Sequence, residues 1–190
     1  MKKTIAFHLS HMSERGTEIS TFDYAFYNKR ILGNNSIIIA NRKKIFNFLE
    51  KFYVDNLKKL NLANDNNIKL FSKRQRSSYL KFAKNFDIFF YDERNEIDKI
   101  CEQNNVSHFY AQKYGNKDNI YSSNTKNLNH VVFMAKEPHG DKYLYISEWL
   151  AKKMTGNPKL CVPYIVNKNN HQFKDDLKKK YNISEDKIVI

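Results

Sequence analysis

The sequence has 190 residues, of which 41% are hydrophobic and 14% aromatic, and this composition predicts one folded domain rather than a disordered chain. The net charge is +13 at pH 7, with 17 basic and 7 acidic side chains in residues 1–90 and 16 and 13 in residues 91–190. Such a surface attracts polyanions. The abundance of Lys, Asn and Ile along the whole chain also fits a plainer explanation, a general compositional bias.

The cysteines and the apolar runs bear on the cellular compartment. Cys101 and Cys161 each lie in an apolar pattern without a CxxC partner, which predicts buried free thiols and neither a disulfide framework nor a zinc site. The N-terminal apolar run is too short for a signal peptide, and no stretch approaches the roughly 18 apolar residues of a membrane span. We therefore expect an intracellular, cytoplasmic protein in a reducing compartment, with no transmembrane segment and no bound metal.

The chain begins with a pattern of strand, loop, helix and strand. Thr4–Leu9 is an apolar run of strand length, and Ser10–Gly16 is a polar loop. Thr17 is suited to cap a helix that ends before Gly33, and the second apolar run, Ser36–Ala40, has the composition of a parallel strand buried on both faces. Ligands of open parallel sheets bind outside the carboxyl ends of the strands, so the loop after the first strand is predicted to face a ligand.

The first helix is expected to be amphipathic. Ile19, Phe22 and Phe26 recur at helical spacing with Ala25 beside them, which predicts that these four form its buried face. Glu18 is expected to face elsewhere, in a first turn where a carboxylate favours the helix dipole.

Apolar runs and helical periodicity alternate along the rest of the chain. Further strands are expected at Ile68–Phe71, Asp87–Tyr91, Ser107–Ala111, His130–Met134, Tyr143–Ile146 and Leu160–Val166. Further helices are expected at Ile45–Leu60 after an Asn41 cap, at Ser78–Asn85, at Glu93–Asn104, and at Glu148–Met154 between a Ser147 cap and Gly156. Gln112–Asn129 is expected to be a surface loop near the ligand crevice. The alternation predicts an α/β fold, a single Rossmann-like domain with a mostly parallel β-sheet flanked by helices.

Residues 1–166 are predicted to form this domain, and residues 167–190 differ from it. Asn167–Asn170 has the composition of a linker, His171–Tyr181 that of a strongly charged helix, and Lys187–Ile190 that of an apolar strand. The last strand either adds to the sheet or begins a further domain.

The common catalytic and nucleotide-binding motifs do not occur in the sequence. It contains no GxxxxGK[ST], GxGxxG, GxSxG or HExxH pattern, and its histidines do not cluster at metal-ligand spacing. Arg15-Gly16-Thr17 has the best physical case for ligand binding. A glycine at a helix entry lets backbone N–H groups approach an anion, and Arg15 can pair with a phosphate or carboxylate. Its position after the first strand distinguishes it from the many loops that contain the same three residues.

Three histidine positions carry different expectations. His8 lies within the first strand and is expected to be a satisfied core residue, whereas His11 in the following loop is a candidate for ligand binding. His139, with Glu137 and Asp141, offers acid–base groups in a turn at a strand's carboxyl end. Hydrogen bonds within that turn explain the three residues equally well.

Several separated stretches resemble one family. RGTEISTFDYAFYNKRILGNNSIII is similar to the N-terminal half of glycosyltransferases of the two-Rossmann-domain (GT-B) type, in particular to bacterial and giant-virus members with an RGTE…YDYA.YN…LGN.S signature. KEPHGDKYLYISEWLAKKMTG and VPYIVN resemble later parts of the same proteins, and KDDLKKKYNISEDKIVI resembles their interdomain stretch.

The resemblance implies a role as the acceptor-side domain of such an enzyme. Arg15-Gly16-Thr17 would then line the interdomain cleft, with Lys136, His139 and Ser147 near the same edge. Members of this type bind the nucleotide sugar chiefly through a second, C-terminal domain. Residues 167–190 would then form the helix that links the two domains and the first strand of the second domain. The implied activity is sugar transfer from a nucleotide sugar to a glycan or other acceptor, without a further cofactor. The chain would need a donor domain from a partner chain, and no residue is assigned as catalytic.

Two other functions stay open. A basic nucleic-acid-binding module fits the charge of residues 1–90, the cluster Lys73–Arg76, and the aromatic Tyr79 and Phe82 beside Lys81 and Lys84. The core periodicity of those aromatic residues weakens this case, and a solvated loop ahead of the next helix explains the cluster as well. A non-catalytic interaction domain would pair its terminal strand with a partner chain.

Overall fold

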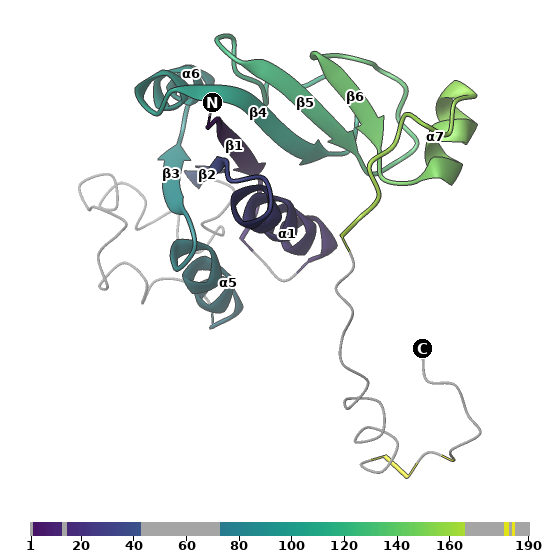
Figure 1. Cartoon of the computed structure of the whole chain (residues 1–190), viewed down its shortest axis with the longest axis horizontal. Coiled ribbons are helices and arrows are strands. Elements are labelled where there is room, and N and C mark those ends of the chain that lie inside the picture. The colour runs from purple at the N-terminus through teal and green to yellow at the C-terminus, as the bar shows by residue number, and fades with distance from the viewer. Residues whose placement is uncertain (1, 13–14, 43–72, 166–180, 183, 185–190) are drawn as a thin grey trace.

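A six-stranded parallel sheet forms the centre of the protein (Figure 1). The computed structural model describes residues 2–12, 15–42, 73–165, 181–182 and 184. The strands are β1 (Thr4–Leu9), β2 (Asn35–Asn41), β3 (Asp87–Tyr91), β4 (Val106–Lys113), β5 (Lys126–Val131) and β6 (Lys142–Tyr145). They lie in the order β3-β2-β1-β4-β5-β6, and every neighbouring pair is parallel. The predicted fold class, a Rossmann-like α/β domain with a parallel sheet flanked by helices, is confirmed.

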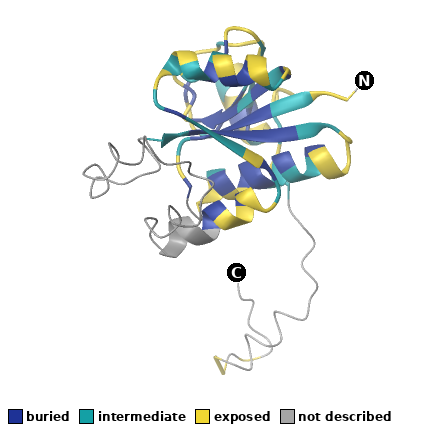
Figure 2. Cartoon of the chain, turned by 90° about the vertical axis from the view of Figure 1, so that its left-hand side faces the viewer, coloured by how far each residue is buried: buried dark blue, intermediate teal, exposed yellow. Residues whose placement is uncertain are grey.

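Helices cover both faces of the sheet (Figure 2). The described helices are α1 (Gly16–Arg30), α5 (Lys73–Ala83), α6 (Arg94–Gln103) and α7 (Glu148–Thr155). Successive residues of a strand point to opposite faces, so β1 sends Phe7 to the core under α1 and α5 and Ala6 to the core under α6. The central strands β1 and β2 are therefore apolar on both faces, which is why their sequences are nearly continuous apolar runs.

The two halves of the sheet are connected differently. Helix α1 links β1 to β2 and helix α6 links β3 to β4, as in an ordinary βαβ unit. The segments 114–125, between β4 and β5, and 132–141, between β5 and β6, make parallel crossovers without a helix. These two segments carry most of the polar residues in the second half of the sheet.

Several sequence predictions hold in detail. Strands β1 and β3 have the predicted bounds, and Ile97, Ile100 and Cys101 form the buried face of α6. Helix α7 begins after Ser147, whose hydroxyl accepts a hydrogen bond from the backbone N–H of Leu150 at 3.2 Å. It ends at Gly156, which adopts the left-handed conformation with φ 78°.

Other boundaries were wrong. Strand β5 ends at Val131, so residues 132–134 of the predicted strand lie in the next connection, and β4 extends to Lys113 into the predicted loop. Residues 160–165 of the predicted strand Leu160–Val166 do not form a strand, because only Cys161 makes a bridge to the edge strand β6. The basic residues 73–76 form the first turn of α5 rather than a loop ahead of it.

Three predicted elements lie outside the described residues: the helix Ile45–Leu60, the strand Ile68–Phe71, and most of the segment 167–190. Both cysteines are free thiols, as predicted, but only Cys101 is buried and Cys161 is half-buried. Burial raises the pKa of the Cys101 thiol to about 11, so it is protonated at neutral pH.

Candidate functional site

The strand order places a switch point between β1 and β4. The chain runs from β1 outward to β2 and β3 on one side, and from β4 outward to β5 and β6 on the other. In open α/β sheets, ligands bind outside the carboxyl ends of the strands where the order reverses in this way. We call this region the switch-point crevice and define it by His11, residues 15–18, Thr21 and Gln112. This region contains residues of the loop after β1, which was predicted from the sequence to face a ligand.

Helix α1 presents unpaired backbone donors to the crevice. The helix begins at Gly16, two residues earlier than predicted, and its first intrahelical bond runs from Ile19 N to Arg15 O at 3.0 Å. The predicted Thr17 cap is wrong, because Thr17 lies inside the first turn and its hydroxyl donates to Glu18 Oε2 at 2.9 Å. The Arg15 side chain, at the N-cap position, makes no capping hydrogen bond. Within the described residues, the N–H groups of residues 16–18 therefore have no hydrogen-bond partner.

The buried face of α1 is more polar than predicted. Glu18 is 4% exposed although it was expected to face away, whereas Ile19 is 44% exposed although it was assigned to the core. Phe22 and Ala25 are buried as predicted. The buried residues of α1 are Glu18, Ser20, Thr21, Phe22, Ala25 and Asn28, so four of the six are polar, and Thr21 contacts a polar partner at the end of β4.

That partner is Gln112. The Thr21 hydroxyl donates to Gln112 Oε1 at 3.4 Å, and both side chains are buried. Within the described chain, Gln112 Nε2 and Ser20 Oγ are buried without a hydrogen-bond partner. Buried amides are usually paired, so the unpaired Gln112 Nε2, beside Thr21 in the second turn of α1, marks a place where a polar ligand would be stabilised. Sequence analysis missed Thr21 and Gln112 because they lie 91 positions apart.

The other predicted residues of the crevice lie at its surface. His11 and Arg15 are exposed, Gly16 is exposed, and Thr17 is half-buried. Met12, which follows His11 in the loop, is 1% exposed, and its side chain packs in the core between the sheet and α1.

Ser147 and Lys136 lie apart from this group. Ser147 follows the carboxyl end of β6, three strands from β1, which corresponds to roughly 14 Å at the usual spacing between strands. Its hydroxyl is used as the α7 cap. Lys136 is exposed in the connection between β5 and β6.

His139 lies at a different place, over the face of β5. Its Nδ1 donates to Glu137 O at 2.6 Å, Asp141 Oδ2 accepts from Asn127 N at 2.7 Å, and Glu137 Oε2 accepts from Lys117 N at 2.8 Å. The three ionisable residues of this turn thus point to separate partners. The structural explanation that the sequence left open, a turn held by its own and neighbouring hydrogen bonds, accounts for them.

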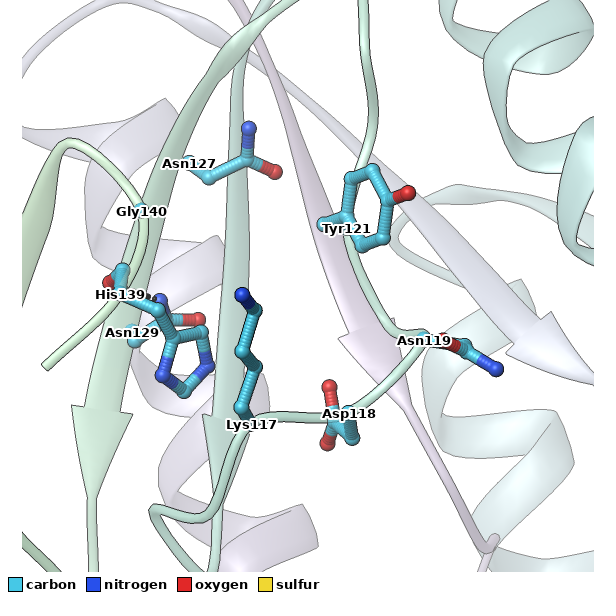
Figure 3. A pocket seen from close by; sticks show the side chains of 8 residues that line it. All are labelled: Lys117, Asp118, Asn119, Tyr121, Asn127, Asn129, His139 and Gly140. Atoms are coloured by element: carbon cyan, nitrogen blue, oxygen red, sulfur yellow. Dashed lines mark hydrogen bonds between the residues drawn. The ribbon is translucent and has the colours of Figure 1, made fainter. Parts of the chain in front are cut away.

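His139 lines a polar pocket of about 460 Å³ (Figure 3). Its walls come from segment 114–125, strand β5 and segment 132–141. The lining residues are Lys117, Asp118, Asn119, Tyr121, Asn127, Asn129, His139 and Gly140. The sequence predicted only one of the eight, because the pocket is built from irregular segments that have no periodic pattern.

The buried His130 of β5 lies among half-buried tyrosines of α1 and β4. The Tyr110 hydroxyl lies 2.5 Å from His130 Nδ1, and the Tyr24 hydroxyl donates to Pro163 O at 2.5 Å. Burial lowers the pKa of His130 to about 4, an effect that the Val162 backbone only partly offsets. Burial also raises the pKa of Tyr24 to about 12, with a further contribution from Tyr164. All of these groups are therefore neutral at pH 7, which suits a structural cluster better than a catalytic one.

The remaining candidates have structural explanations. His8 is buried and its Nε2 lies 2.8 Å from the Tyr91 hydroxyl, so the prediction of a satisfied core histidine is confirmed. Tyr79 and Phe82 are 6% and 2% exposed, and Lys81 lies over the Phe22 ring at 4.1 Å. These rings are not available for stacking on bases, which removes the aromatic support for nucleic-acid binding.

Within the described part of the chain, no group of three or more histidine, cysteine or acidic side chains could hold a metal ion. The helices in that part are all too short or too polar to cross a bilayer. A scan against protein-family models and a search of curated proteins both found no match.

Proposed function

We propose that the chain is the acceptor-binding half of a glycosyltransferase of the two-Rossmann-domain type, and that the switch-point crevice holds the acceptor. The observation that carries the proposal is the position of Arg15-Gly16-Thr17. These residues form the entry of α1 beside the end of β1, where the strand order reverses. The sequence resemblance supplies the reaction, and the crevice supplies a suitable place for its acceptor.

The polar groups of the crevice suit a hydroxylated ligand. Backbone N–H groups of residues 16–18 offer donors, and the carboxylate of Glu18 offers an acceptor in the same turn. An isolated helix N-terminus favours phosphate, but a buried carboxylate in its first turn already compensates the helix dipole. A sugar hydroxyl both donates and accepts hydrogen bonds, so it matches this combination better than a dianion does. Arg15 lies exposed at the entrance, where it can donate to an acceptor or to a departing diphosphate.

The functional groups in this domain indicate which part of the reaction it would support. Sugar transfer requires an acceptor hydroxyl aligned with the anomeric carbon and stabilisation of the departing diphosphate. The crevice provides the first requirement and one basic contact toward the second. The nucleotide sugar is a substrate that a donor domain would chiefly hold.

Calorimetric titration of the chain with a panel of glycans and nucleotide sugars, alone and with a donor domain added, tests the proposal. We expect saturable binding of at least one glycan, weakened about tenfold by Arg15→Gln because one charge-assisted hydrogen bond is lost. Arg30→Gln is the matched control, since Arg30 is exposed at the opposite end of the same helix. Absence of binding to every glycan and nucleotide sugar, even with the donor domain present, would overturn the proposal.

A further inference from the structure

The polar pocket in Figure 3 lies over strand β5, between the two crossover segments. Asn127 and Asn129 alternate along β5 and point to the same side, where no helix separates the strand from the two crossover segments. The volume of about 460 Å³ falls within the usual range for small-molecule sites. None of the lining residues belongs to the crevice, so a ligand of this pocket is independent of the proposed glycosyltransferase function.

Hydrogen bonds fix the walls of the pocket. Asn127 Oδ1 accepts from Ser122 N at 2.9 Å, and its Nδ2 donates to Ser122 O at 2.8 Å and to Thr125 O at 3.1 Å. On the other side, Tyr143 donates from its hydroxyl to Gly115 O at 2.6 Å. Segment 114–125 is thus tied to β5 and β6 although it has no regular structure. A pocket with fixed walls loses little conformational entropy when a ligand binds.

Lys117 is the lining residue whose ammonium makes no ion pair with a described carboxylate. Lys113 Nζ donates to Asp118 Oδ1 at 2.8 Å and to Ile120 O at 3.0 Å, so this buried ammonium and its carboxylate form a neutral pair. Lys117 extends its side chain into the pocket in Figure 3. Its ammonium makes no ion pair with a carboxylate of the described residues. A bound anion would therefore be its first counter-charge.

Two further groups are available for hydrogen bonds. Asn129 is 4% exposed and donates from Nδ2 to His139 O at 2.6 Å, which leaves its Oδ1 as an acceptor. The His139 ring lines the pocket, but Nδ1 donates to Glu137 O and Nε2 accepts from Lys113 Nζ at 3.4 Å, so neither nitrogen is free. The Tyr121 hydroxyl, which can donate or accept, has no hydrogen-bond partner in the described part of the chain.

From this arrangement we propose that the pocket binds a small polyhydroxylated anion, such as a sugar phosphate or a sugar acid. The negative charge lies against the Lys117 ammonium, and the hydroxyl groups bond to Asn129 Oδ1 and the Tyr121 hydroxyl. Hydroxyl groups satisfy these acceptors, which a bare inorganic anion does not. A neutral sugar leaves the lysine without a counter-charge.

Calorimetric titration of the full chain with glucose 6-phosphate, glucuronate, glucose and inorganic phosphate tests the site. We expect saturable binding of at least one of the two anionic sugars, and which of them binds identifies the anion. Glucose and phosphate should each bind at least about tenfold more weakly, since each lacks one half of the recognised chemistry. Failure of both anionic sugars to bind at about 10 mM would overturn the proposal, as would equal binding of glucose or of phosphate alone.

Two lysine variants test where the anion binds. Lys117→Gln should weaken binding at least about tenfold, because it removes the one ammonium among the lining residues. Lys142→Gln removes an exposed lysine that does not line the pocket and should leave binding unchanged. Equal losses from the two changes would indicate a non-specific basic surface and overturn the site. Arg15→Gln should have no effect here, which separates this result from the test of the glycosyltransferase proposal.

Discussion

The Tyr110 hydroxyl oxygen and His130 Nδ1 lie 2.5 Å apart on the neighbouring strands β4 and β5. His130 is 2% exposed, and the rings of Tyr24 and Tyr164 surround it with centroids 5.6 and 6.0 Å away. No carboxylate is among these contacts to stabilise a positive imidazolium. The folded state therefore holds His130 neutral, and this has a measurable consequence for stability.

The stability of the fold should fall in mild acid because of His130. Burial lowers its pKa to about 4, whereas an unfolded histidine titrates near 6.5. As the pH falls from about 6.5 to about 4, the unfolded chain binds a proton that the folded chain does not, so the free energy of unfolding decreases. The stabilisation is fully present above pH 6.5, and its loss amounts to at most about 3 kcal/mol. Urea unfolding at pH 7.5 and pH 4.5 measures it.

The variant His130→Gln is the comparison for this experiment. It removes the titrating group, so the pH dependence of its unfolding free energy should be shallower than that of the wild type over the same interval. His108, whose pKa is also lowered by burial and by Lys3 and Lys126, contributes equally to both proteins and cancels. If the two proteins lose the same stability between the two pH values, His130 is not the group responsible.

A second prediction separates the structural role of Ser147 from a role in binding. Ser147→Ala should lower the free energy of unfolding by about 1 kcal/mol, because the N–H of Leu150 loses its acceptor. Ser147→Asp should retain most of the stability, since a carboxylate accepts the same bond and favours the helix dipole. Chemical denaturation of the three proteins measures both effects. A Ser147→Ala variant as stable as the wild type would contradict the capping role.

The elements that could be predicted from sequence are those whose signal is local. Strand β3 is bounded by polar residues and was predicted at its true ends, and α7 has both of its caps within ten residues. The error in β5 has the same local origin, because Phe133 and Met134 continue its apolar run although they are 53% and 57% exposed. Periodicity reports hydrophobicity, and it does not distinguish a buried apolar residue from an exposed one.

The candidate sites depended on pairs that are distant in sequence. Glu18 was assigned to the solvent side of α1 because it is charged, yet it is buried, and so is Thr21, which contacts Gln112 on β4. Lys113 was assigned to a surface loop, yet it is 9% exposed and paired with Asp118. A single sequence carries no signal for such pairings. The loop after β1 was proposed as a site because its place in a βαβ unit is itself local, and His139 was proposed because it lies in a turn directly after a predicted strand.

The last prediction concerns Gly115, where the wall of the polar pocket leaves no room for a side chain. A Cβ at this position would lie 2.6 Å from Val131 Cγ1, 2.7 Å from Ala135 Cβ and 2.9 Å from the Tyr143 hydroxyl oxygen. The backbone also has φ +126°, a conformation that residues with a Cβ rarely adopt. Gly115→Ala should therefore destabilise the fold by about 3 kcal/mol or more, from overpacking and backbone strain together.

Gly33→Ala is the matched control, because Gly33 also has a positive φ, +66°, but a Cβ there would meet nothing within 4 Å. It should cost only the backbone strain, about 1 kcal/mol. The difference between the two variants in urea unfolding isolates the steric cost at Gly115. Equal losses would show that segment 114–125 yields easily to a methyl group. Such a segment would not hold the Gly115 carbonyl firmly against the Tyr143 hydroxyl, and the pocket would then lack the rigid wall on which its selectivity depends.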